Sequence, residues 1–376
     1  LVTRLLYRLR SLGEQRPFDT VTLSYIFSFV FLVLENGGID RKEAEEADEQ
    51  IVLATEFISY HTDACNDPTL PRQKLLSVLI DSMQTYTQHF RAFKDCFTSL
   101  CRSIAPSMST AETDTAVRGV IVPDPSVRNA VLQAISAELD LTDREFYEEI
   151  WLARYDDVTE HRDLANEIWE ENELKVATDS AAKELPYLES KDSQLRRAAA
   201  RAIAGAIKEQ PASFEPMLSS LQETYLERAK PRKPELDRYG MPIKKDLSDP
   251  WEARHGISLA LKELSVSFPE QQLVPFVHFL VESGPLSDAS ATVRDSMVEA
   301  AVSVVTAQGK SLVEPLMKLC ESTLESSSTS QAQDLVNEAV VIMYGALAQH
   351  LPEGDSRTPK VVQRLLATLS TPSESV

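Results

Sequence analysis

One helical pattern recurs along this chain and decides its fold class. An acidic residue is followed within a few positions by an arginine and then by a run of apolar and small residues. The arginines of these segments are Arg128, Arg162, Arg196, Arg254 and Arg294. They lie 34, 34, 58 and 40 residues apart, and Asn337 takes the same place 43 residues further on. A period of about 34–47 residues is typical of stacked helix pairs, so the sequence predicts an array of such pairs.

The segment DSQLRRAAARAIAGAI, residues 192–207, shows why each unit is expected to be helical. Its apolar positions share one face of a helix with a period of 3.6 residues; they are Leu195, Ala199, Ala202, Ile203 and Ala206. Asp192 precedes this face and can accept hydrogen bonds from the free N–H groups of the first turn. We expect an all-α, α-α superhelical fold with about eighteen helices in about nine pairs.

The chain reads as two parts that differ in regularity. Residues 1–115 predict less regular helical repeats and end in a polar stretch, PSMSTAETDT, that is interpreted as a linker over residues 106–115. Residues 116–376 predict regular repeats with an inserted basic loop at about 229–248, which accounts for the single long interval. The chain starts without a methionine and ends within a repeat pattern, so it is expected to be an internal fragment of a longer protein.

Composition narrows the classes of function. The net charge of −20 disfavours nucleic-acid binding over the whole surface and suits basic partners. The four cysteines have no metal-ligand spacing and are typical of reduced thiols in a cytoplasmic protein. The longest apolar run, residues 21–34, is shorter than the roughly 20 residues needed to cross a bilayer. We therefore expect a cytoplasmic protein with no metal, no cofactor and no membrane partner.

Two short motifs resemble catalytic sequences but lack their context. Gly309–Ser311 reads GKS, yet a phosphate-binding loop needs a glycine five residues earlier, where Val304 stands. His161–Asn166 reads HRDLAN, but a kinase catalytic loop needs asparagine where Ile168 stands. Both segments fit turns or helices of repeats, and the sequence therefore predicts no enzymatic activity.

The recurring acidic and basic residues have two interpretations. In the first, aspartates and arginines of successive repeats form a structural ladder inside the array; in the second, the arginines form a basic ridge. The ladder residues are Asp124, Arg128, Arg162, Asp192, Arg196, Asp249, Arg254, Asp288 and Arg294. We favour the ladder, because these positions recur in register whatever the local surface charge.

The basic insert is the candidate contact with a partner. Its cations are Arg228, Lys230, Arg232, Lys233, Arg238, Lys244 and Lys245, and its acids are Glu227, Glu235, Asp237 and Asp246. A basic loop on an acidic protein can contact RNA phosphates. The alternative is a solvated loop or a cap on the neighbouring repeat.

The order of these elements resembles a known family. The acidic residue, arginine and small-residue helix match the HEAT-repeat pattern. The succession VTEHRDLANEIWEEN, DSQLRRAAARAIAGAI, DPWEARHGISLALKEL and PLSDASATVRDSMVEAAVSVVTAQGK resembles the general-control translational activator family from about residue 120 to the end. Residues 1–115 are similar more loosely. The resemblance implies a HEAT-type solenoid without catalytic residues.

The resemblance also implies a role. Members of that family bind ribosomes and promote activation of the kinase of translation initiation factor 2 alpha during amino-acid starvation. This fragment would then be a scaffold segment whose partner is the ribosome, through ribosomal protein or rRNA. The kinase and an ABC-type co-activator would bind other parts of the full-length protein, and an elongation-factor-three-like block would follow Val376. The alternative is a karyopherin-like nuclear transport receptor segment that binds basic cargo.

Overall fold

The regular elements of this protein are helices. The computed structural model describes residues 1–39, 44–230, 238, 249–325 and 330–369, and no strand occurs among them. The helices α1 to α18 are joined by turns and short 3₁₀ helices. The chain divides into two compact units, Leu1–Lys175 and Val176–Val376. The prediction of an all-α solenoid of helix pairs is confirmed.

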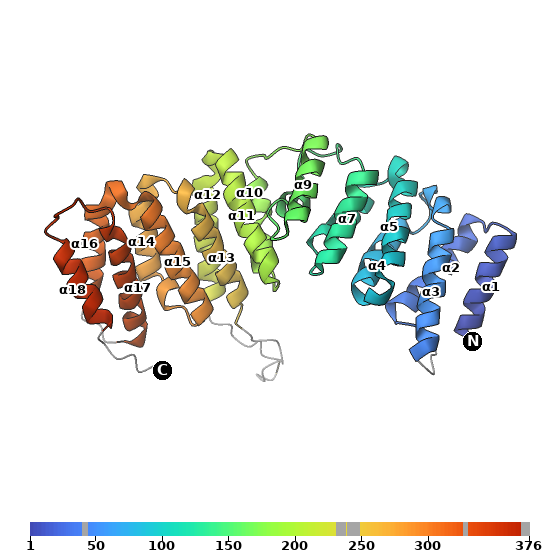
Figure 1. Ribbon diagram of the computed structural model, residues 1–376, viewed down its shortest axis with the longest axis horizontal. Helices are drawn as coiled ribbons and strands as arrows, with labels where there is room; N and C mark the ends of the chain where they lie inside the picture. The colour runs from blue at the N-terminus through green and yellow to red at the C-terminus, as the bar shows by residue number, and fades with distance from the viewer. Residues whose placement is uncertain (40–43, 231–237, 239–248, 326–329, 370–376) are drawn as a thin grey trace. The chain divides into compact units, whose positions relative to one another are not determined.

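The first unit stacks its helices in two rows (Figure 1). Each odd-numbered helix packs on the next odd-numbered one, from α1 through α9. Of the even-numbered helices, α2 packs on α4 and α4 on α6, and the 3₁₀ helix η4 (Arg118–Ile121) packs on α8. The helices are α1 (Val2–Gln15), α2 (Thr20–Glu35), α3 (Ala44–Tyr60), α4 (Arg72–Thr85), α5 (Phe90–Ile104), α6 (Thr110–Val117), α7 (Pro125–Glu138), α8 (Glu148–Ala153) and α9 (Thr159–Glu171).

The second unit repeats this arrangement. Its odd-numbered row runs from α11 to α13, α15 and α17, each in contact with the next. The helix α10 is short and is extended by the 3₁₀ helix η5 (Leu185–Glu189). The helices are α10 (Ser180–Lys183), α11 (Ser193–Glu209), α12 (Phe214–Ala229), α13 (Trp251–Glu263), α14 (Glu270–Glu282), α15 (Ala291–Gln308), α16 (Val313–Leu324), α17 (Gln331–Ala348) and α18 (Thr358–Leu369).

Small side chains bring the odd-numbered helices of the second unit close together. In α11, Ala199, Ala202 and Ala206 are buried with Ile203, which is the face that the sequence predicts. In α13, Gly256 approaches η5 so closely that a Cβ atom built on it would lie 2.1 Å from the carbonyl oxygen of Leu188. Because no real Cβ contact is that short, the packing of α13 on η5 requires glycine at this position.

The polar stretch interpreted as a linker is part of the fold. Residues 105–107 form a 3₁₀ helix, and α6 begins at Thr110. Ser109 and Glu112 form a capping box, in which the Ser109 N–H donates to Glu112 Oε2 over 2.7 Å. The linker prediction for residues 106–115 was therefore wrong, because Glu112 satisfies the free N–H of the cap and holds the helix start. The predicted change of regularity at residue 115 stays a prediction.

The helix caps are specific enough to test one at a time. Asp192 is the N-cap of α11, and its Oδ1 accepts the Gln194 N–H over 2.8 Å. Asp192→Ala should destabilise α11 by about 1 kcal/mol, because an N–H of the first turn loses its acceptor. Hydrogen exchange of peptides from α11 measures this locally, which suits a repeat array that need not unfold in one step. Ser193→Ala at the exposed neighbouring position is the control, and equal exchange in both variants would contradict the cap.

Candidate interaction surface

Four of the recurrent arginines make the same local contact. In each, Nη1 donates to the main-chain carbonyl oxygens of the residues six and five positions earlier. The pairs of acceptors are Val122 and Pro123 for Arg128 (both 3.0 Å), Asp156 and Asp157 for Arg162 (2.7 and 3.1 Å), Ser190 and Lys191 for Arg196 (2.7 and 3.1 Å), and Asp288 and Ala289 for Arg294 (2.7 and 3.3 Å). The arginine therefore fastens the turn that precedes each of α7, α9, α11 and α15.

Two of the five recurrent arginines, Arg128 and Arg254, bond to a carboxylate of the following repeat. Arg128 Nε lies 2.9 Å from Asp156 Oδ2, just ahead of α9. Arg254 Nε and Nη2 donate to the two oxygens of Asp288, ahead of α15, over 2.7 and 2.8 Å. Both acceptors stand six residues before the arginine of their own repeat. An arginine therefore bonds to the next repeat where the residue six positions before the next repeat's arginine is an aspartate.

The contact at Arg254 is the more extensive of the two. Arg254 Nη1 also donates to Asp249 Oδ1 over 2.5 Å, and Asp288 Oδ2 also accepts the Tyr225 hydroxyl over 2.7 Å. Arg254 and Asp288 are 3% and 6% exposed. The hydrogen bonds to Asp249 and then to Asp288 raise the pKa of Arg254, and burial followed by the bond to Asp288 raises the pKa of Tyr225. The buried charges are thus well compensated.

The remaining predicted ladder residues have other roles. Asp124 and Asp192 cap their own helices, with Asp124 Oδ1 accepting the Ser126 N–H over 2.8 Å. Asp249 binds Arg254 of its own repeat. The acid of the Arg128 contact is Asp156, which the sequence analysis missed. The signal that would have found it is the six-residue spacing to Arg162, which Asp288 and Arg294 share.

Arg196 is buried against an aromatic ring. It is 3% exposed, and its Nε has no hydrogen-bond partner. Its guanidinium lies over the ring of Trp251, 5.4 Å from the centroid. Burial lowers the pKa of Arg196. The equivalent carboxylate position of the next repeat is Ser248, which lies outside the described residues.

The first unit holds a buried ion pair that the sequence analysis also missed. Arg72 is 1% exposed and donates to both oxygens of Glu112 over 2.7 and 2.8 Å. Its Nη1 and Nη2 also donate to the hydroxyl and the carbonyl of Ser107. Burial opposes ionisation of Glu112, yet the hydrogen bonds from Arg72 and Ser109 lower its pKa overall. This pair ties the start of α4 to the start of α6.

The basic insert is described only in part. Arg232, Lys233, Lys244 and Lys245 lie outside the described residues, and Arg238 is exposed. Arg228, in the last turn of α12, binds Glu189 with Nη2 at 2.8 Å from both carboxylate oxygens. Lys230 Nζ donates to Glu227 Oε2 over 2.5 Å. Arg228 and Lys230 therefore already have acidic partners within the chain.

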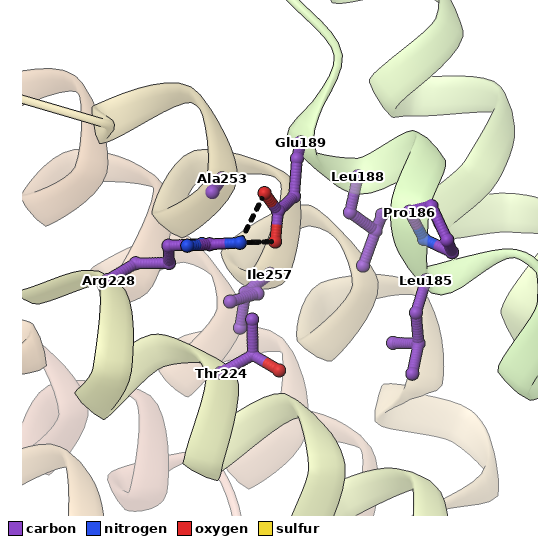
Figure 2. A pocket seen from close by; sticks show the side chains of 8 residues that line it. All are labelled: Leu185, Pro186, Leu188, Glu189, Thr224, Arg228, Ala253 and Ile257. Carbon is purple, nitrogen blue, oxygen red and sulfur yellow. Dashed lines mark hydrogen bonds and ion pairs between the residues drawn. The ribbon is translucent and has the colours of Figure 1, made fainter.

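A hollow lies beside these residues, between η5, α12 and α13. Its volume is about 370 Å³, and Figure 2 shows the ion pair of Arg228 and Glu189 at one side of it. The other lining residues are Leu185, Pro186, Leu188, Thr224, Ala253 and Ile257. Of the lining residues, η5 contributes Leu185, Pro186, Leu188 and Glu189, α12 contributes Thr224 and Arg228, and α13 contributes Ala253 and Ile257.

The motifs considered as catalytic lie in ordinary repeat elements. Gly309–Leu312 is a 3₁₀ helix between α15 and α16, and His161–Asn166 lies within α9. Among residues with a described placement, no group of His, Cys, Asp and Glu could hold a metal ion. None of the helices described here has both the length and the hydropathy to cross a bilayer.

Two known families of HEAT-repeat proteins match this chain. The family described as "Stalled ribosome sensor GCN1, HEAT repeats" matches residues 117–349, and "Fungal GCN1-like, HEAT repeats" matches residues 1–84. The chain belongs to the GCN1 HEAT-repeat family. The predicted resemblance to the general-control translational activator is thereby confirmed, and the cross-repeat contacts of Arg128 and Arg254 lie in the part that the longer GCN1 match covers.

The GCN1 relatives are much longer than this chain. The "eIF-2-alpha kinase activator GCN1" of Saccharomyces cerevisiae is 32% identical over 398 residues, which cover 100% of this chain and 15% of the relative. The human "Stalled ribosome sensor GCN1" is 28% identical, with 96% and 14% covered. "Protein ILITYHIA" of Arabidopsis thaliana is 31% identical, with 69% and 10% covered. The chain thus spans about one seventh of the GCN1 relatives that it matches along its whole length.

Proposed function

We propose that this chain is a non-enzymatic scaffold segment of a cytoplasmic, ribosome-associated regulator that promotes activation of the eIF-2-alpha kinase. The observation that carries the proposal is membership of the GCN1 family, whose relatives are named as a kinase activator and as a sensor of stalled ribosomes. The kinase and an ABC-type co-activator would bind other parts of the full-length protein.

The fold supports a geometric mechanism. Each helix pair buries its apolar face against its neighbours, so the array holds surface residues at fixed spacings. Contacts that are weak one at a time add up when they are held on one array, because each raises the effective concentration of the next. The charges that the chain buries, such as Arg254 and Asp288, are used in packing between repeats rather than in a reactive cleft.

The insert is the proposed ribosome contact. It concentrates cations on a chain with a net charge of −20, and ribosomal surfaces rich in phosphate or acidic side chains attract such a segment. Membership of the GCN1 family favours this role over the karyopherin-like alternative. No feature of the described residues specifically supports that alternative.

Co-sedimentation with purified ribosomes at low salt tests the proposal. The variant changes Lys230, Arg232, Lys233, Lys244 and Lys245 to glutamate, and we expect binding weaker by on the order of tenfold or more, because favourable charge contacts become repulsive. A matched variant reverses five exposed lysines elsewhere in the second unit: Lys191, Lys208, Lys310, Lys318 and Lys360. Equal binding of the two variants would contradict a specific role of the insert.

A further inference from the structure

We propose that the pocket between α1, α3 and α5 binds an arginine side chain of a basic protein segment. The proposal goes beyond the proposed function, because this pocket belongs to the first unit and its partner is defined by chemistry alone. A pocket for one side chain is smaller than the extended inner face with which a karyopherin-like receptor would bind cargo.

The pocket lies where three helices of the odd-numbered row pack together. The helix α1 packs on α3 and α3 packs on α5, and the three lie side by side in the first unit (Figure 1). Glu14 comes from α1, Glu56 and Tyr60 come from α3 one turn apart, and Asp95 comes from α5. The volume of about 500 Å³ lies within the usual range of about 300–1,000 Å³ for ligand pockets.

The lining carries an excess of negative charge. Three of its twelve residues are acidic, Glu14, Glu56 and Asp95, and one is a permanent cation, Arg10. Arg10 Nε lies 3.2 Å from Glu14 Oε1, and Arg10 Nη1 pairs with Glu56. Asp95 lies 3.9 Å from Arg91, but these side chains are 69% and 95% exposed, so water screens the pair. A second cation in the pocket would therefore meet carboxylates that the chain neutralises only in part.

The helix α3 extends this negative charge beyond the pocket. It contains no lysine or arginine, and its acids are Glu45, Glu46, Asp48, Glu49 and Glu56. Like charges on one helix add to a common potential, which attracts cations on either side of an arginine anchor and repels phosphate. This part of the surface therefore favours a basic peptide over a nucleic acid.

Ring side chains make the pocket suitable for arginine in particular. Four lining residues carry rings, namely Phe57, Tyr60, His61 and His89. Phe57 and His61 are buried, whereas Tyr60 is 60% exposed. A planar guanidinium can stack on the Tyr60 ring while its N–H groups reach the carboxylates beside it. The ammonium of lysine has neither the plane nor the fork of donors, so the pocket should prefer arginine.

His61 is an independent sign that the pocket lacks a partner. It is 6% exposed, and its Nε2 has no hydrogen-bond partner among the described residues. A Cβ built on Gly13 would lie 3.0 Å from this Nε2, so the atom faces α1 at a residue between Arg10 and Glu14 in the sequence. Burial lowers the pKa of His61, and the neutral ring does not repel a cation. An arginine that reaches the floor of the pocket can supply the missing hydrogen bond.

The same groups do not form a metal site. Over the described ranges of the chain, no three His, Cys, Asp or Glu side chains are placed to hold a metal ion. A guanidinium carries five N–H donors spread over a plane, so it can reach carboxylates that are too far apart to share one ion.

Three labelled peptides test the anchor without ribosomes. Each carries fluorescein and one central residue between two lysines, and that residue is arginine, lysine or citrulline, which keeps the shape of arginine without its charge. Fluorescence anisotropy with the 376-residue chain at low salt should show about tenfold tighter binding of the arginine peptide than of the citrulline peptide. The lysine peptide should bind more weakly than the arginine peptide despite its equal charge. Equal binding of the arginine peptide and either control would overturn the proposal.

A matched pair of double variants places the binding in the pocket. Glu56→Gln with Asp95→Asn removes two carboxylates from the lining, and we expect the preference for arginine over citrulline to fall below about threefold. Asp163→Asn with Glu167→Gln removes two exposed carboxylates from α9 in the same unit, and it should keep the preference. An equal loss in both double variants would show only a general attraction to the acidic surface, and the proposal would be wrong.

The ring is tested separately from the charges. Tyr60→Leu should remove the preference for arginine over lysine and keep the preference of both over citrulline, because the carboxylates remain. Tyr25→Leu, at a tyrosine of α2 that is 76% exposed, is the control and should bind all three peptides as the unchanged chain does. Both tyrosines are exposed, so we expect these variants to fold. A Tyr60→Leu variant that still prefers arginine over lysine would contradict the assignment, and no outcome here depends on whether the chain binds ribosomes.

Discussion

Arg254→Met should destabilise the packing of α13 on α15 by about 3–5 kcal/mol, which is the usual cost of removing one partner from a buried ion pair. Methionine keeps the length of the side chain but leaves Asp288, at 6% exposure, without its two charged hydrogen bonds. The Tyr225 hydroxyl and the Ser290 N–H remain as donors to Asp288, so we expect a weakened repeat junction rather than a chain that cannot fold. Hydrogen exchange of peptides from α13 and α15 measures the loss.

The same two helices supply a matched control. Lys262 of α13 and Glu299 of α15 form an exposed ion pair with an Nζ–Oε2 distance of 2.8 Å and side chains that are 42% and 61% exposed. Lys262→Met should cost no more than about 1 kcal/mol, because water screens the pair. Equal rates of hydrogen exchange in α13 and α15 of the Arg254→Met and Lys262→Met variants would contradict the ladder interpretation at this junction.

Gly256→Ala should destabilise the second unit by about 3 kcal/mol despite the better helix propensity of alanine, which offsets at most about 1 kcal/mol. The added Cβ would lie 2.1 Å from the carbonyl oxygen of Leu188 and 2.8 Å from its carbonyl carbon. Main-chain atoms cannot move aside as a side chain can, so η5 and α13 must separate. Thermal unfolding and hydrogen exchange of η5 and α13 measure the effect.

Gly309→Ala is the control for this prediction. A Cβ at Gly309 would lie 3.0 Å from a terminal methyl carbon of Leu347, and a flexible side chain can yield by a few tenths of an ångström. We therefore expect a clearly smaller loss than at Gly256. Native-like stability of Gly256→Ala would show that α13 does not pack on η5 as closely as described.

The arginine series made the repeats predictable because it combines two independent periods. The spacing of Arg128 and Arg162 defines the repeat, and the 3.6-residue spacing of apolar positions around Arg196 defines the helix. Which arginine reaches a carboxylate depends on the sixth residue before the next arginine. The sequence analysis chose acids that lie close to each arginine in the sequence. It therefore chose Asp124 and Asp192, which are helix N-caps, and missed Asp156, which pairs with Arg128.

The start of α6 was predictable and was missed. Ser109 and Glu112 have the spacing of a capping box, but the polar composition of residues 106–115 outweighed that signal. The pairing of Glu112 with Arg72 was not predictable in the same way, because it joins residues 40 positions apart through tertiary packing.

The hollow could not have been derived from sequence. It is lined by η5, α12 and α13, and the close approach of Gly256 in α13 to Leu188 in η5 is a tertiary contact between residues far apart in the sequence. The sequence likewise predicted Arg228 as a cation available to a partner, whereas in the fold it is already bonded to Glu189. Composition shows where charges are plentiful, whereas only the fold shows which of them are already paired.

Hydrogen exchange of the 376-residue chain, with and without purified ribosomes, shows whether the insert contacts the ribosome. We expect bound ribosomes to slow exchange at residues 230–249 and in η5 and α12, and to leave the buried junction of α13 and α15 unchanged. Identical exchange throughout the chain in the presence of saturating ribosomes would contradict it.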